Sequence, residues 1–163
     1  MSRMSSLRCM MQLVAQNGYV AHQLDVTTAY LNARLDHDIY MEQPHGTVRD
    51  GCSKVCYLRK SLYGLKQSAK LWNDTIHNYL VSLGFSRNAA DMCLYKRSDK
   101  RGTIYLIVWV DDIVIVAENQ KVVDDFMRHI SNKFTVKDLV PLTFLTFLMC
   151  CLNYSTLFLR NPI

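Results

Sequence analysis

The chain has 163 residues and a formal net charge of +5, with half of its residues hydrophobic and a fifth charged, which indicates one globular domain and excludes a disordered chain. Its six cysteines show neither a CxxC pair nor zinc-finger spacing, so we expect reduced, mostly buried thiols in an intracellular protein and no zinc site. The N-terminus lacks the apolar core and cleavage site of a signal peptide, which argues against secretion.

The first part of the chain predicts one helix followed by three strands. Apolar residues at helical spacing over 7–14, a serine cap at position 5 or 6 and a stop at Gly18 predict a short helix. Residues 20–28 read as a strand that holds Asp25 among apolar neighbours. Strict alternation would point this acid to solvent, whereas a functional acid would stand there for its chemistry. Residues 39–41 and 54–58 predict two short strands.

The second part predicts two helices and a hairpin. Residues 61–83 carry the longest helical pattern, which Gly84 ends, and a second helix follows Asn119. Strands are expected at 92–97, at 134–136 and in a hairpin over 104–117. The order of these elements predicts an α+β fold, an antiparallel sheet with two helices packed on one face.

Two adjacent acids, Asp111 and Asp112, interrupt the apolar hairpin IYLIVWVDDIVIVA at its centre. Two apolar runs of strand length place these acids at the tip of a buried hairpin. Two neighbouring carboxylates there are costly unless a cation holds them, and hard oxygen ligands suit Mg²⁺. The simpler interpretation is a polar turn. With Asp25 on a neighbouring strand, the three carboxylates are the minimum that could hold two Mg²⁺ ions.

A basic segment and an apolar segment complete the pattern. Between Asp50 and Asp74 there are five basic residues and no acidic one: Lys54, Arg59, Lys60, Lys66 and Lys70. A basic surface of this kind would suit the backbone of a nucleic acid, and the alternative is an ordinary solvated face. Residues 139–159 carry no charge. That run is long enough to cross a bilayer, although its proline and polar residues favour a segment of a soluble protein, and no membrane contact is expected.

Several long motifs resemble the copia-type reverse transcriptases of long-terminal-repeat retrotransposons. They occur in the family's order, over residues 5–139: HQLDVTTAYLN, LDHDIYMEQP, KVCYLRKSLYGLKQSAKLW, SLGFSRNAADMCLY, IYLIVWVDDIVIVA and FTVKDL. Residues 140–163 match no family pattern and form a divergent apolar tail. The resemblance implies a polymerase palm, part of a Pol polyprotein, that extends a DNA primer with deoxynucleotides on an RNA or DNA template.

The resemblance also implies a metal centre. Asp25 looks like the metal-binding aspartate of the first palm strand, and Asp111 and Asp112 look like the aspartate pair of the catalytic hairpin. The backbone carbonyl of Val26 would join the metal shell. The family's chemistry implies two Mg²⁺ ions, which Mn²⁺ can replace.

Further residues are assigned by the same analogy to the nucleotide and the template. Tyr30 resembles the aromatic gate that excludes a 2′-hydroxyl, although a core aromatic is the alternative. Tyr63 and Gly64 resemble the loop beneath the incoming nucleotide, and Lys66 and Lys70 would meet template phosphates. The lysine that protonates pyrophosphate would be Lys137 or, alternatively, Lys133.

The sequence departs from the family at several points. Trp109 stands where the family has tyrosine, with its large ring expected against the sheet, and Ala69 stands where it has proline. The fingers, the primer grip, the thumb and the ribonuclease H region have no counterpart in these residues. We therefore expect weak or no polymerase activity, and the alternative is an inactive transposon relic that at most binds nucleic acid. The family implies a cytoplasmic location in a virus-like particle, or a nuclear one.

Overall fold

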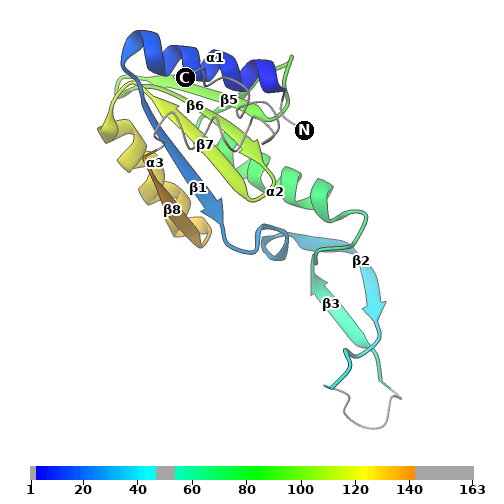
Figure 1. The fold of residues 1–163 in the computed structure, drawn as a ribbon. Coiled ribbons are helices and arrows are strands. Elements are labelled where there is room, and N and C mark those ends of the chain that lie inside the picture. The colour runs from blue at the N-terminus through cyan, green and yellow to red at the C-terminus, as the bar shows by residue number, and fades with distance from the viewer. Residues whose placement is uncertain (1–2, 47–53, 142–163) are drawn as a thin grey trace, which may run out of the picture. The chain divides into compact units, whose positions relative to one another are not determined.

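The computed structural model describes residues 3–46 and 54–141, which form an α+β structure (Figure 1). Two compact units divide the chain: unit 1 comprises residues 1–27 and 83–163, and unit 2 comprises residues 28–82. Each is described by itself. The predicted tail over 140–163 lies almost wholly outside the described residues.

Unit 1 is built on a six-stranded antiparallel sheet with the strand order β4-β5-β6-β7-β1-β8. The strands are β1 (Val20–Val26), β4 (Ser86–Arg87), β5 (Leu94–Asp99), β6 (Gly102–Trp109), β7 (Asp112–Ala117) and β8 (Val136–Pro141). The predicted hairpin is the β6–β7 pair, and it lies at the centre of the sheet beside β1 (Figure 1). Its many Val and Ile residues suit a strand covered on both faces, and all but the first residue of β7 are buried.

Helix α1 (Met4–Asn17) covers one face of this sheet. Its buried Leu7 and Met10 form an apolar cluster with Ala21 of β1, Ile107 of β6 and Val114 of β7. The helix ends as predicted at Gly18, which has a left-handed φ of 67° and whose N–H donates to the carbonyl of Val14. The amphipathic stripe over 7–14 is therefore core packing.

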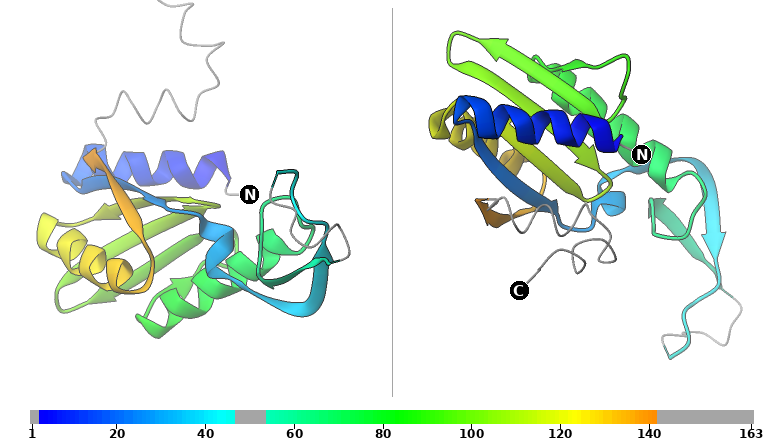
Figure 2. Two further views of the ribbon diagram at one scale, coloured as in Figure 1. Left: turned by 90° about the horizontal axis from the view of Figure 1, so that it is seen from below. Right: turned by 45° about the horizontal axis from the view of Figure 1, so that its top comes forward.

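Helix α3 (Gln120–Lys133) covers the opposite face of the same sheet, as the left view of Figure 2 shows. Asn119 caps it by accepting a hydrogen bond from the Val122 N–H, and its four buried apolar residues include Phe126, whose ring meets Phe85 edge-on at 5.6 Å. In unit 1, helices therefore lie on both faces. The longest predicted helix belongs to unit 2, so the expectation that it shares a face with α3 stays a prediction.

Unit 2 contains the 3₁₀ helix η1 (Ala29–Asn32), the paired strands β2 (Arg34–Met41) and β3 (Cys56–Lys60), and helix α2 (Ser68–Ser82). Helix α2 begins at Ser68, seven residues after the predicted start at 61. Gly64 has a φ of 98°, which no α-helix accommodates, and the buried Ser68 hydroxyl bonds the Leu62 carbonyl at 2.5 Å. Gly84 ends the helical run as predicted, with a φ of 84°.

Two local predictions are wrong. No serine side chain caps α1: its N-cap is Arg3, and the Ser6 hydroxyl instead donates to the Asp91 carboxylate at 2.5 Å, which ties the helix to the loop before β5. The described cysteines are not mainly core residues, because Cys9 is exposed and Cys56 and Cys93 are half-buried.

Over residues 3–46 and 54–141, no helix is long and apolar enough to cross a membrane. The apolar run that begins at Leu139 lies mainly beyond the described residues.

Candidate active site

Asp25 and Asp112 lie directly opposite each other on the paired strands β1 and β7. Residues opposite each other on antiparallel strands project from the same face with Cβ atoms about 4.5–5.5 Å apart. Both side chains are half-buried. The structure thus brings together two of the three predicted carboxylates, on the face that α1 covers further along the sheet.

Asp111 lies in the two-residue turn that joins β6 to β7, and its backbone is fastened to β1. The Val26 N–H donates to the Asp111 carbonyl at 2.7 Å, so the tip of the hairpin is held against the end of the strand that carries Asp25. Val26 itself is 1 % exposed. Four predicted site residues therefore converge at one place in unit 1: Asp25, Val26, Asp111 and Asp112.

The same turn holds a β-branched residue in an unfavourable conformation. Val110 has a φ of 53°, and two-residue hairpin turns that need positive φ at their first position usually place glycine there. Backbone of this kind costs on the order of 1–3 kcal/mol and persists where the surroundings fix it. Here the surroundings are the β6–β7 ladder and the Val26–Asp111 hydrogen bond.

Gln23, which sequence reasoning did not single out, contacts the site directly. Its side-chain amide donates to Asp112 Oδ1 at 2.9 Å. Because β1 alternates, Ala21, Gln23 and Asp25 project from one face, and Gln23 lies between the apolar cluster under α1 and the carboxylates. In the sequence, the sign of this role is a polar residue two positions before Asp25, on a strand face that is otherwise apolar.

Lys137 flanks the carboxylates on the other side. It lies opposite Asp25 on β8, so Asp25 has an acid as its neighbour on one strand and a base on the other. Lys133, the alternative proton donor, lies in the last turn of α3. Trp109 pairs with Asp112 from β6, and 41 % of its surface is exposed.

In the part of the chain that the structure describes, no group of three or more His, Cys, Asp or Glu side chains is close enough to hold a metal ion. The pairing of Asp25 with Asp112 brings two carboxylates together, and Asp111 joins them through its backbone. The assignment of these residues to a metal centre therefore stays a prediction.

Unit 2 brings together the two tyrosines predicted to contact the nucleotide. Tyr30 lies in η1 and is half-buried, whereas Tyr63 lies in the loop after β3 and is 52 % exposed. Their ring centroids are 4.5 Å apart at an interplanar angle of 44°. Tilted contact of this kind stabilises both ring positions. Tyr30 is thus neither a fully buried core residue nor an isolated surface ring.

The glycine and the lysines predicted beside these tyrosines lie at the start of α2. Gly64 requires its positive φ of 98°, and a Cβ added there would meet nothing within 4 Å, so backbone conformation rather than space calls for glycine. Lys66 lies in the turn before the helix and Lys70 in its first turn, and both are exposed. An anion could approach both ammonium groups from solvent.

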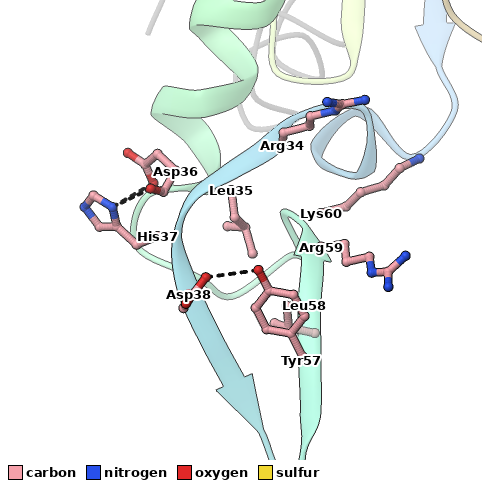
Figure 3. Close-up of a pocket in the computed structure, with 9 residues that line it drawn as sticks. All are labelled: Arg34, Leu35, Asp36, His37, Asp38, Tyr57, Leu58, Arg59 and Lys60. Atoms are coloured by element: carbon pink, nitrogen blue, oxygen red, sulfur yellow. Dashed lines mark hydrogen bonds and ion pairs between the residues drawn. The ribbon is translucent and has the colours of Figure 1, made fainter.

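Two grooves among the described residues lie away from the predicted catalytic acids, although Arg59 and Lys60 of the basic segment line the first. One, of about 490 Å³, runs along β2 and β3 in unit 2 (Figure 3). Within it the Tyr57 hydroxyl donates to Asp38 at 3.0 Å, and this bond raises the pKa of Tyr57. The other, of about 690 Å³, lies at the start of α3 in unit 1.

The comparison with protein families identifies the chain. Residues 1–152 match the family described as reverse transcriptase (RNA-dependent DNA polymerase). The chain belongs to this family. The match reaches past residue 139, where the recognisable motifs end.

Similar curated proteins place this reverse transcriptase domain in the copia type, as its motifs predicted. It is 35% identical over 135 residues to the Retrovirus-related Pol polyprotein from transposon RE1 of Arabidopsis thaliana, covering 82% of this chain and 9% of that protein. It is 37% identical over 141 residues to the corresponding polyprotein from transposon TNT 1-94 of Nicotiana tabacum, covering 85% of this chain and 11% of that protein. It is 39% identical over 117 residues to the putative transposon Ty5-1 protein of Saccharomyces cerevisiae, covering 71% of this chain and 38% of that protein. The chain thus spans about a tenth of the length of the two plant polyproteins.

Proposed function

We propose that this copia-type chain supplies the palm of an RNA-directed DNA polymerase, which extends a DNA primer with deoxynucleotides on an RNA or DNA template. The observation that carries the proposal is the convergence of Asp25, Asp111 and Asp112. Asp25 and Asp112 pair across β1 and β7, and the backbone carbonyl of Asp111 accepts a hydrogen bond from the Val26 N–H at 2.7 Å. Reverse transcriptase membership supplies the reaction class.

The donor set fits a divalent cation. Asp25 and Asp112 are like charges placed directly opposite each other, and Lys137, opposite Asp25 on β8, supplies one counter-charge for the two. Carboxylate oxygens are the ligands that Mg²⁺ prefers, and Asp25, Asp111 and Asp112 would hold it together with the Val26 carbonyl. When bound, two such ions supply activation of the primer hydroxyl and neutralisation of the triphosphate.

The positions of the hairpin turn, Lys137 and Tyr30 indicate a role for each in the proposed reaction. The strained hairpin turn is fastened to β1 and holds Asp111 beside Asp112, the first residue of β7, so that reacting groups are positioned before they meet. Lys137 is the stronger candidate for the proton donor, because it lies opposite Asp25, whereas Lys133 ends α3. In unit 2, the contact between Tyr30 and Tyr63 holds the Tyr30 ring in place as a gate against ribonucleotides.

Primer extension tests this function. Purified chain, a labelled primer on an RNA template, deoxynucleotides and Mg²⁺ are compared with the Asp111→Asn variant. The matched control is Asp74→Asn, the same change at an exposed position of α2. We expect weak extension that Asp111→Asn abolishes and Asp74→Asn preserves. Extension that survives Asp111→Asn would overturn the proposal.

A second function rests on a different observation. The five cations between residues 54 and 70 are all exposed, which suits binding to the backbone of a nucleic acid whether or not the chain acts on it; they are Lys54, Arg59, Lys60, Lys66 and Lys70. Fluorescence anisotropy with a labelled RNA–DNA duplex separates the two functions. Binding that weakens with salt and with Lys66→Ala plus Lys70→Ala, in a chain that extends no primer, would favour this second function.

A further inference from the structure

The hydrogen bond from Gln23 to Asp112 has a defined direction. An ionised carboxylate only accepts hydrogen bonds, so the Gln23 amide must present its NH₂ group to Asp112 Oδ1, 2.9 Å away. Hydrogen bonds to a charged acceptor are stronger than neutral ones. The bond therefore fixes the orientation of the carboxylate and occupies one of its two oxygens.

The position of Gln23 on β1 makes an amide unusual there. Its face of the strand carries Ala21, which is buried under α1, and the neighbouring strand carries Val114 directly opposite Gln23. An amide that is half-buried among such neighbours loses water contacts and must regain them in the protein. Gln23 regains one by donating diagonally across the strand pair to Asp112.

We propose that Gln23 is a positioning residue of the metal centre: it acts through Asp112 by holding that carboxylate in the orientation that binds a divalent cation. The inference rests on the proposed function, because it assigns Gln23 to the same site. Groups that hydrogen-bond to metal ligands typically change metal affinity or activity by about 10–100-fold when they are removed.

Mn²⁺ binding to the full chain, followed by the electron paramagnetic resonance signal of free Mn²⁺, tests the inference without any activity assay. Gln23→Met keeps the length of the side chain and removes its donor. The matched control is Gln16→Met, the same change at an exposed position of α1. We expect Gln23→Met to weaken Mn²⁺ binding about 10–100-fold and Gln16→Met to leave it unchanged.

A double-mutant cycle separates positioning from general damage to the fold. If Gln23 acts through Asp112, then Gln23→Met has no further effect on Mn²⁺ affinity once Asp112→Asn is present. An equal loss in both backgrounds would assign Gln23 a structural role and overturn the inference. Equal affinity of wild type and Gln23→Met would overturn it too, while leaving the proposed function intact. A wild-type chain that binds no Mn²⁺ would overturn both.

Discussion

Asp25 of β1 and Asp112 of β7 are direct cross-strand partners, so their two carboxylates lie side by side on one face of the sheet. This relationship has opposite consequences with and without a cation. Without one, the like charges repel; with one, both become ligands. Stability and metal binding should therefore respond in opposite directions when the charge of Asp112 is removed, whereas Asp25 also lies opposite Lys137.

Asp112→Asn should weaken the stabilisation of the chain by Mg²⁺. Wild type should gain about 2.7 kcal/mol of unfolding free energy when Mg²⁺ is present at 100 times the wild-type dissociation constant, and the variant, whose affinity for Mg²⁺ is lower, should gain much less at the same concentration. In metal-free buffer the variant should be as stable as wild type or more stable by up to about 1 kcal/mol, because the repulsion is gone. Urea unfolding with and without Mg²⁺ measures both. Equal stabilisation of wild type and variant by Mg²⁺ would contradict the prediction.

Val110→Gly should stabilise the chain by about 1 kcal/mol. Val110 has a φ of 53°, and the strain that glycine relieves, on the order of 1–3 kcal/mol, exceeds the entropy that glycine adds to the unfolded chain, roughly 0.5–1 kcal/mol. The control is Val110→Ala, which keeps a Cβ and should gain much less. Thermal unfolding of the three proteins gives the comparison. A less stable Val110→Gly would mean that the turn is not strained.

Asn119, the N-cap of α3, should contribute more to the stability of the chain than an exposed asparagine without a capping role. Asn119→Ala removes the acceptor for the Val122 N–H and should cost about 1 kcal/mol of stability. Asn132→Ala is the control, because Asn132 is an exposed residue near the other end of the same helix and alanine has the higher helix propensity. Chemical denaturation should therefore show a loss for the first variant and little change or a small gain for the second.

The hydrogen bonds between Arg101 and Asp99 predict a stability change at acid pH. Arg101 lowers the pKa of Asp99 from 3.8 to about 2, chiefly through its side-chain hydrogen bond. A depressed carboxyl pKa stabilises the folded chain above the unfolded value and ceases to do so as the pH falls through the folded value. Arg101→Gln should thus be less stable than wild type above pH 4, and the difference should shrink between pH 4 and pH 2.

Arg128→Gln is the control for this experiment. Arg101 also pairs with Asp125 at 2.8 Å, and Arg128 pairs with Asp125 at 3.1 Å without touching Asp99. The melting temperature of each variant, measured from pH 5 to pH 2, shows whether the acid-dependent change belongs to Asp99. The same pH dependence in both variants would assign it to Asp125 instead.

Local patterns predicted the central hairpin, α1 and α3 well. The β6–β7 run consists almost entirely of strand-forming residues, and two acids in its middle could only be a turn or a site. Gly18 ends α1 because its left-handed conformation turns the chain out of the helix, and glycine adopts that conformation at little cost. Strong propensity and turn chemistry act over a few residues, so a single sequence carries them.

Features that depend on distant partners were missed. Ser6 looked like a helix cap, but its hydroxyl bonds Asp91, 85 residues away. The 3₁₀ helix η1 follows Thr28, whose φ of 51° carries no sequence signature, because threonine seldom adopts that conformation. The bond from Gln23 to Asp112 depends on the register of two strands that lie far apart in the chain. Register of this kind follows from the packed sheet and not from local preference.

The most direct measurement of the central claim is where a divalent cation binds in this chain. Small additions of Mn²⁺ to the isotope-labelled protein broaden the amide resonances nearest to the ion, and two-dimensional NMR reports them residue by residue. The account predicts that the amides of Asp25, Val26, Asp111 and Asp112 broaden first, and that Asp25→Asn abolishes the effect. Broadening that begins instead at Asp36 and Asp38 on β2, or that persists unchanged in Asp25→Asn, would contradict a metal centre at the hairpin tip.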